Sequence, residues 1–217
     1  MLCSYKAMPI RTKRRRHIRP ELSGITGVIL AGGKSSRYGK NKAFEKVNGV
    51  PLIERVIEVV GSVFEDLLLI TNAPDEYGYL NLPMVQDLIK GLGPLGGIYT
   101  GLNTISGDAG FFVACDMPFL NAALVRHISE LRSGFDAVVP RVGWMIEPLH
   151  ALYTKGCIDA VKVMIDAHEY QFIKFFDRVR IRYIEEDELR AIDLNLRSFL
   201  NVNRREDLSK IMRSGCH

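Results

Sequence analysis

The chain has 217 residues, 47% of them hydrophobic, which is enough for one sizeable core in one domain or two. It contains no run of 18 apolar residues and no apolar segment near its start, so we expect neither a membrane span nor a secretory signal. The formal net charge is +4, but the first 20 residues carry seven Lys and Arg and no acid, which leaves 22 basic and 25 acidic residues in the rest of the chain.

Residues 1–23 are predicted to form a basic leader without a fixed structure. Clustered cations such as "RTKRRRHIR" can bind RNA or another polyanion because they release counterions. No aromatic platform for stacking bases accompanies these charges, so we do not expect nucleic-acid binding. A polyanion-binding protein that acts through this leader stays open as the alternative from another functional class.

The cysteines and histidines argue against a structural metal site. The four cysteines are scattered, without a CxxC pair, and the five histidines show no ligand spacing. This pattern is typical of a reduced chain, so we expect a cytoplasmic protein. We also expect a monomer.

From residue 24 onward, predicted strands alternate with predicted helices. Short apolar runs predict buried strands, and apolar residues spaced three and four apart predict helices. In chain order the strands are expected at 25–30, 66–71, 82–87, 110–116, 136–142, 148–153 and 179–184, and the helices at 51–60, within 93–105, and at 121–132, 157–167 and 205–212. The alternation predicts one α/β domain over residues 24–217, built on an open and mostly parallel sheet.

Ligands of such sheets bind beyond the carboxyl ends of the strands, where three predicted strands end in suggestive residues. The first strand runs from Leu30 into Ala31, Gly32 and Gly33, and two later strands end at Asp87 and Asp116. The two glycines let the backbone come close to a ligand. Four cations then follow within nine residues: Lys34, Arg37, Lys40 and Lys42. We therefore predict a phosphate-binding loop.

Two generic nucleotide motifs nearly fit and are rejected. The segment "GGKS" at 32–35 resembles a P-loop, but Val28 stands where that motif needs a glycine. The segment "GLGPLG" at 91–96, with Asp116 twenty residues on, matches the dinucleotide fingerprint. "DLIK" separates it from the preceding strand, and a strand–glycine–helix unit already opens the fold, so we do not expect a nicotinamide or flavin dehydrogenase.

Five blocks together resemble one family of nucleotidyltransferases. "LAGGKSSRYGKNK" (30–42) is similar to the signature of enzymes that join a nucleoside monophosphate to a phosphorylated acceptor. Within that superfamily the five blocks resemble the molybdenum cofactor guanylyltransferases of the MobA type. The other four are "VQDLIKGLGPLGGI" (85–98), "ACDMPFL" (114–120), "EPLHALY" (147–153) and "FLNVNRREDL" (199–208).

The resemblance implies a reaction, a cofactor and a fold. GTP and the molybdenum cofactor, or molybdopterin, would give the guanine dinucleotide cofactor and pyrophosphate, with Mg²⁺ as the metal. The implied fold is a three-layer α/β sandwich, with the Rossmann-like mixed sheet of nucleotide-diphospho-sugar transferases. Other molybdenum cofactor biosynthesis proteins are possible partners. A related CTP-dependent or sugar-phosphate-dependent enzyme stays open as the alternative.

The resemblance also implies site residues. Its GTP contacts fall on Leu30, Ala31, Gly32, Lys42, Asp87 and Asp116, and Asp116 is the implied Mg²⁺ ligand. We further expect Arg37 and Lys42 to face the departing β- and γ-phosphates. The turn Gly93–Pro94–Leu95 is a candidate contact for guanine, and the amides of Asn201 and Asn203 are candidates for the acceptor side.

This sequence departs from the family pattern at a few positions. Asn41 stands where the family often has Asp, Tyr38 where it has Met, and Arg204 and Arg205 where it has Thr and Pro. None of these changes removes a group that the chemistry requires. The only tryptophan, Trp144, is expected in the core; if it were exposed instead, it could stack on a flat pterin.

Overall fold

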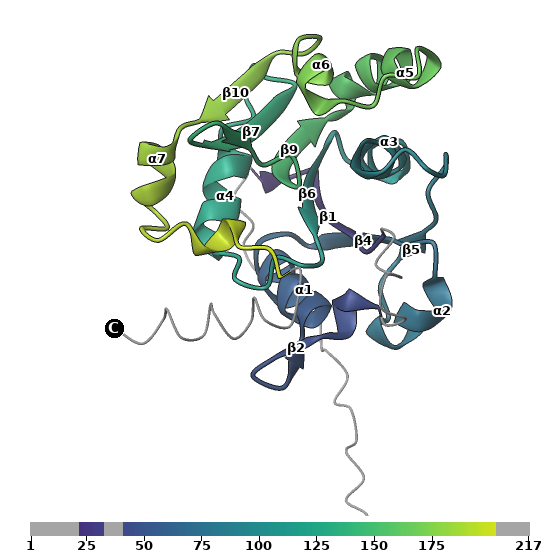
Figure 1. The fold of residues 1–217 in the computed structure, drawn as a ribbon, viewed down its shortest axis with the longest axis vertical. Coiled ribbons are helices and arrows are strands. Elements are labelled where there is room, and N and C mark those ends of the chain that lie inside the picture. Colours follow the sequence, from purple (N-terminus) through teal and green to yellow (C-terminus); the bar gives the residue numbers. More distant parts are fainter. Residues whose placement is uncertain (1–21, 33–40, 203–217) are drawn as a thin grey trace, which may run out of the picture.

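The computed structural model describes residues 22–32 and 41–202, and its centre is an eight-stranded sheet (Figure 1). The strands run along the sheet in the order β10-β7-β9-β6-β1-β4-β5, and β8 pairs with β7. Their bounds are β1 Ile25–Leu30, β4 Asp66–Ile70, β5 Met84–Val85, β6 Ala109–Ala114, β7 Ala137–Val142, β8 Met145–Ile146, β9 His150–Thr154 and β10 Ile181–Ile184. A separate hairpin joins β2 (Lys46–Val47) to β3 (Val50–Pro51).

Most of the strands point the same way. β1 is parallel to both β4 and β6, β4 is parallel to β5, and β7 is parallel to β10. β9 is antiparallel to both of its neighbours, β6 and β7. The carboxyl ends of β1, β4, β5, β6, β7 and β10 therefore share one edge of the sheet, and this edge is where α/β sheets bind ligands.

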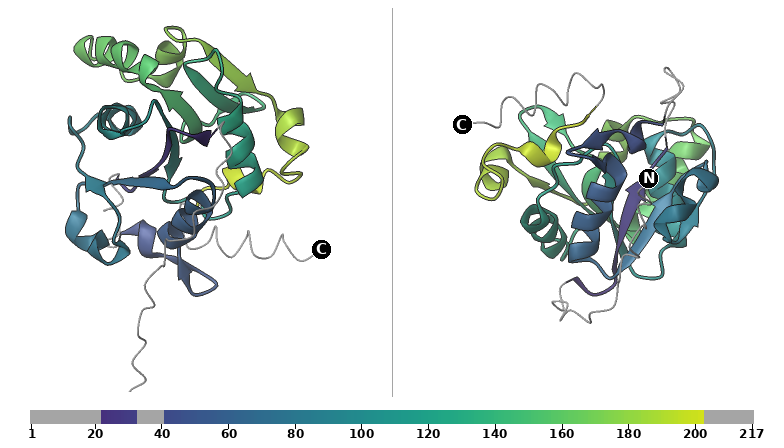
Figure 2. Two further views of the ribbon diagram at one scale, coloured as in Figure 1. Left: turned by 180° about the vertical axis from the view of Figure 1, so that it is seen from behind. Right: turned by 90° about the horizontal axis from the view of Figure 1, so that it is seen from below.

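Helices cover both faces of the sheet, which gives three layers, as the two views of Figure 2 also show. On one face, α1 (Leu52–Val63), α4 (Ala122–Glu130) and α7 (Glu186–Arg190) bury apolar residues against the sheet. On the other face lie α3 (Pro94–Thr104), α5 (Ile158–Asp166) and α6 (Phe172–Phe176). The predicted fold class, a three-layer α/β sandwich with a mixed and mostly parallel sheet, is confirmed.

Glycines let α3 lie close to the sheet. A Cβ atom on Gly101 would lie 2.5 Å from the Phe112 ring, and one on Gly97 would lie 3.0 Å from the Leu30 side chain. Both partners belong to strands next to the predicted site. The glycines of the segment 91–101 therefore serve helix packing as well as the turn in front of α3.

Short elements account for most differences from the prediction. α2 (Pro74–Tyr77), β8, α6, α7 and the β2–β3 hairpin have no more than five residues per element, too few for a periodic signal. The predicted helix 205–212 and residues 1–21 lie outside the described residues. Leu22, at the end of the predicted leader, is buried in the core, so the folded body begins no later than Leu22. No helix of the described ranges is long and apolar enough to cross a membrane.

Candidate active site

An ion pair between Lys42 and Asp116 lies at the ligand-binding edge of the sheet. The Lys42 ammonium Nζ donates a hydrogen bond of 2.7 Å to Asp116 Oδ2. The two residues are 74 positions apart in the chain, and both side chains are about one-fifth exposed, so solvent and ligands can reach them. The structure thus brings together the two residues that the sequence predicted for phosphate and metal binding.

Asn41 fixes the position of Lys42. Its side-chain Oδ1 accepts a hydrogen bond from Ala43 N at 3.1 Å and caps the short 3₁₀ helix Lys42–Phe44. Its Nδ2 donates to Glu76 Oε2 at 2.6 Å and to the hydroxyl of buried Tyr77 at 2.7 Å. An aspartate would have no N–H to give these acceptors, so the departure from the family pattern at position 41 has a local reason.

The backbone of Asp116 connects the site to the end of the described chain. Its carbonyl accepts a hydrogen bond of 2.9 Å from Val202 N, and Val202 packs against Val47 and Leu52. Asn201, predicted for the acceptor side, therefore lies next to a residue that is bonded to Asp116. This contact was not predictable from local patterns, because 86 residues separate the two ends of the bond.

Part of the backbone at the end of β1 is already used in hydrogen bonds with neighbouring strands. Ala31 N donates to Ile70 O at 2.9 Å, so the Ala31 amide is already used inside the sheet. Leu30 O accepts from Cys115 N at 3.1 Å. What this turn can offer a base is therefore carbonyl oxygens together with the backbone of Gly32, where an added Cβ would meet no described atom within 4 Å.

Asp87 lies on the same edge, but far from Asp116. The order β5-β4-β1-β6 puts three strand spacings between the ends of β5 and β6, which is about 14 Å. Asp87 and Asn72 are joined by two hydrogen bonds, from Asn72 Nδ2 to Asp87 Oδ2 (2.7 Å) and from Asp87 N to Asn72 Oδ1 (3.2 Å). Sequence reasoning missed Asn72, although a polar residue directly after a strand of this sheet was the signal to look for.

The turn before α3 contributes backbone only. Gly93 has a φ of 59° and precedes Pro94, the first residue of α3. The Leu95 side chain is fully buried in the core, so its expected contact with guanine is restricted to main-chain atoms. Pro94 has no N–H, and the Gly96 and Gly97 N–H groups both donate to Gly93 O, at 3.1 and 3.4 Å, so the Leu95 N–H is the donor of this turn that a ligand could use.

Two further groups at the edge have shifted pKa values. Burial, reinforced by Asp116 and opposed by Lys42, raises the pKa of the Cys115 thiol to about 12, so Cys115 is not a thiolate nucleophile. Burial also raises the pKa of the Glu147 carboxyl above its usual range.

Three further findings concern a metal site, Trp144 and the predicted residues outside the described ranges. Within the described ranges, no group of three His, Cys, Asp or Glu side chains is arranged to hold a metal ion. The predicted core position of Trp144 is wrong, because its side chain is fully exposed at 101% of the reference area. Five predicted residues lie outside the described residues: Gly33, Lys34, Arg37, Lys40 and Asn203.

Comparison with known proteins identifies the family. Residues 27–180 match the family model of the MobA-like NTP transferase domain. The chain belongs to the MobA-like NTP transferases. One relative is a protein from Pelotomaculum thermopropionicum named probable molybdenum cofactor guanylyltransferase, with 41% identity over 85% of this chain and 90% of the relative. Another is the molybdenum cofactor guanylyltransferase of Desulfosudis oleivorans, with 36% identity over 87% of this chain and 95% of the relative.

Solved structures agree with this assignment. The molybdopterin-guanine dinucleotide biosynthesis protein A of Archaeoglobus fulgidus has a TM-score of 0.75 and 26% identity, covering 87% of this chain and 97% of its own. The 4-diphosphocytidyl-2C-methyl-D-erythritol synthase of Anaerococcus prevotii, at 11% identity and a TM-score of 0.68, shares the fold over 90% and 98% of the two chains. The resemblance to MobA-type nucleotidyltransferases found in the sequence is therefore confirmed.

Proposed function

We propose that this MobA-like NTP transferase moves GMP from GTP to the terminal phosphate of the molybdenum cofactor, giving the guanine dinucleotide cofactor and pyrophosphate. The Lys42–Asp116 pair at the carboxyl edge is the observation that carries the proposal, since it combines one cation and one carboxylate where a nucleotide would lie. The names of relatives with 31–41% identity supply the acceptor and the base.

The chemistry needs positive charge more than a base. An oxygen of the acceptor phosphate forms a bond to the α-phosphorus of GTP, and the bond from that phosphorus to the bridging oxygen breaks. Negative charge then gathers on the departing pyrophosphate. Lys42 would neutralise this charge, with Arg37 as its proposed companion. Since the attacking phosphate is already ionised, no general base is required.

The residues present fit a magnesium ion. Mg²⁺ takes oxygen ligands and commonly needs only one or two carboxylates besides substrate phosphates. Asp116 provides a partly exposed carboxylate, and Asn201 lies on the adjoining segment. When bound, the ion would neutralise phosphate charge and orient the leaving group. Lys42 would then exchange its bond to Asp116 for bonds to the triphosphate.

The spacing along the sheet edge suits a nucleotide. Guanine N1 and N2 carry protons that need acceptors; the Ala31 carbonyl oxygen is one, and the Leu30 carbonyl oxygen, which already accepts from Cys115 N, has a second lone pair. A ribose hydroxyl can donate to Asp87, whose carboxylate is already held in place by Asn72. With the phosphates at Asp116, about 14 Å remain for the rest of the nucleotide. We therefore propose Gly32, Asp87 and the turn at Gly93 as the nucleoside side of the site.

Turnover of radiolabelled GTP tests the proposal directly. With molybdopterin or its molybdenum-loaded form, label should move into the dinucleotide product, while CTP and UTP should not replace GTP. Lys42→Ala should lower the rate by a factor of about a hundred or more. Lys46→Ala, which removes an exposed lysine of the neighbouring hairpin, is the matched control. Product formation with CTP alone, or normal turnover by Lys42→Ala, would contradict the proposal.

A further inference from the structure

The tip of the β7–β8 hairpin exposes two large apolar side chains. Trp144 is fully exposed and the neighbouring Met145 is 65% exposed. An exposed tryptophan leaves a large aromatic surface in water that a core position would have buried. An exposed aromatic side chain with an apolar neighbour is a candidate place for a ligand to bind.

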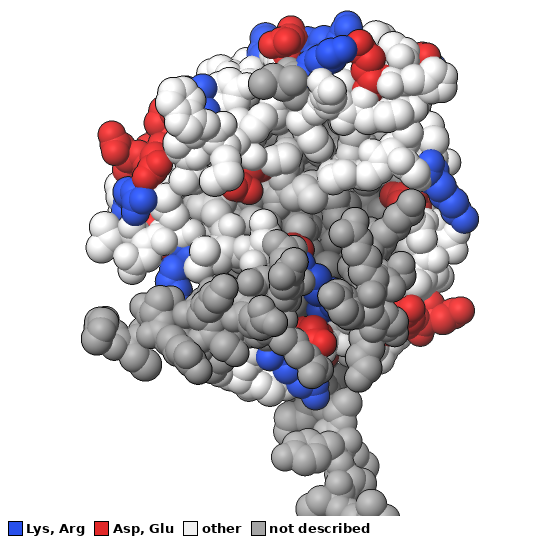
Figure 3. Space-filling model, viewed as in Figure 1, with Lys and Arg blue, Asp and Glu red and all other residues white. Residues whose placement is uncertain are grey.

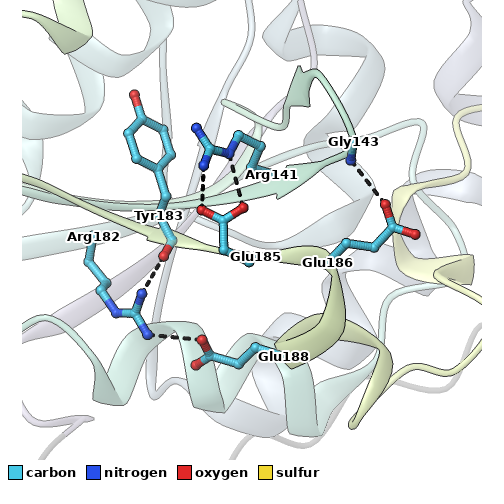
Figure 4. Close-up of polar contacts among 7 residues, drawn as sticks. All are labelled: Arg141, Gly143, Arg182, Tyr183, Glu185, Glu186 and Glu188. Carbon is cyan, nitrogen blue, oxygen red and sulfur yellow. Dashed lines mark hydrogen bonds and ion pairs between the residues drawn. The ribbon is translucent and has the colours of Figure 1, made fainter.

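The hairpin is tightly built. Val142 pairs with Met145, so Gly143 and Trp144 form a two-residue loop. Gly143 has a φ of 57°, as required of the first loop residue in a type II′ hairpin turn. The N–H of Gly143 donates to Glu186 Oε2 at 3.0 Å, which ties the loop to the start of α7 (Figure 4). Trp144 is therefore presented by a backbone with a defined conformation.

A second clamp holds the strand that leads into the loop. Arg141 donates two hydrogen bonds to the Glu185 carboxylate, from Nε at 3.0 Å and from Nη2 at 2.6 Å. Its guanidinium also lies 4.9 Å from the centre of the Tyr183 ring (Figure 4). A bidentate pair of this kind fixes geometry as well as charge. The clamp and the turn together limit the entropy that Trp144 would lose on binding a ligand.

The charges around the hairpin are largely balanced. Acidic side chains gather over α7 in the space-filling view (Figure 3). Three of the glutamates at this end have arginine partners: Glu185 with Arg141, Glu186 with Arg190, and Glu188 with Arg182. These three carboxylates would therefore repel an anionic acceptor less than unpaired carboxylates would.

The hairpin also lies on the same sheet edge as the phosphate end of the proposed site. β7 runs in the same direction as β6, so its carboxyl end, which leads into the hairpin, is on the edge that holds Asp116. β9 is the only strand between them, which gives two strand spacings, or about 10 Å. In the proposed acceptor, the terminal phosphate and the outer pterin ring are separated by a comparable length, because a fused ring and a methylene lie between them.

The geometry points to Trp144 as the platform on which the flat pterin of the acceptor stacks. This inference rests on the proposed function and specifies which residue holds the far end of the acceptor. Stacking of a heterocycle on an aromatic side chain is sensitive to removal of that side chain by about tenfold to a hundredfold in affinity. The affinity for GTP should not change, because the nucleotide binds at the other end of the proposed site.

Fluorescence gives a direct readout, because Trp144 is the only tryptophan of the chain. Titration with a 6-substituted pterin phosphate should quench the tryptophan emission in a saturable way. Glycerol phosphate, which carries the phosphate without a flat ring, is the control and should leave the emission unchanged. Absence of specific quenching by the pterin phosphate would overturn the inference.

Kinetics separate this inference from the proposed function. Trp144→Ala should raise the KM for molybdopterin at least tenfold and leave the KM for GTP unchanged, and Trp144→Phe should restore part of the loss. Val163→Ala, which shortens a half-exposed apolar residue of α5, is the matched control. Normal transfer with an unchanged acceptor KM in Trp144→Ala would reject the stacking role and keep the reaction. Quenching without any transfer of GMP would reject the reaction and keep the pterin site.

Discussion

His150 should make the fold sensitive to acid. It lies in β9, opposite Val113 of β6, with its ring 5.5 Å from the centre of the Phe111 ring and 4.8 Å from that of Phe199. The side chain is fully buried, and neither ring nitrogen has a hydrogen-bond partner in the described part of the molecule. Burial lowers its pKa from 6.5 to about 4, and the nearby Ser198 backbone and Asp193 carboxylate oppose that shift without cancelling it.

The direction in which stability changes with pH follows from the difference between the pKa of His150 in the unfolded chain and in the folded chain. The unfolded chain takes up a proton on His150 near pH 6.5, while the folded chain does so only near pH 4. Stability from this residue is therefore fully present above pH 6.5 and is lost as the pH falls toward 4. Between pH 7.5 and pH 5 the loss amounts to about 2 kcal/mol, and below pH 4 it reaches about 3 kcal/mol.

The contribution of His150 to the free energy of unfolding is measured by urea unfolding of the wild type and of His150→Leu, each at pH 7.5 and at pH 5. Leucine has a similar volume and cannot titrate, so carboxylates elsewhere contribute equally to both proteins and cancel. The free energy of unfolding should fall by about 2 kcal/mol more in the wild type than in the variant. Equal pH dependence in the two proteins would show that His150 is not held neutral by burial.

Three further substitutions test single contacts. Asn41→Asp places a second carboxylate beside Glu76 and should raise the KM for GTP about tenfold, and adding Glu76→Gln should restore it in steady-state assays. Gly101→Ala forces a Cβ against the Phe112 ring and should cost about 1–3 kcal/mol of stability in thermal unfolding. Asp116→Asn should abolish measurable GMP transfer while the melting temperature stays within a few degrees, because its side chain is partly exposed.

The sequence predicted the long elements of the fold well, for a physical reason. Buried strands such as Ile25–Leu30 are continuous apolar runs, and α1 repeats its apolar residues at helical spacing, so each carries its own signal. The short strand β8 and helix α7 depend on tertiary contacts, such as the bond from Gly143 to Glu186. A short stretch of sequence does not reveal tertiary contacts of this kind.

The candidate site was predictable in its residues and not in their contacts. Lys42 and Asp116 were found from strand ends and a known motif, yet their direct ion pair depends on the packing of the two loops. The Asn41–Glu76 and Val202–Asp116 contacts join segments far apart in the chain. The exposure of Trp144 also depends on tertiary structure, since the turn that presents it is held by α7 and β10.

In the proposed site, the position of β9 would let one sheet edge serve two substrates. It enters the sheet antiparallel, between β6 and β7, and so spaces the hairpin with Trp144 from Asp116. If β7 paired directly with β6, that spacing would fall to about 5 Å, too short for a phosphate and a pterin to lie side by side. On the other side of Asp116, the order β1-β4-β5 would give the proposed nucleotide site about 14 Å. Strand order, which no local motif encodes, therefore sets the reach of the site in both directions.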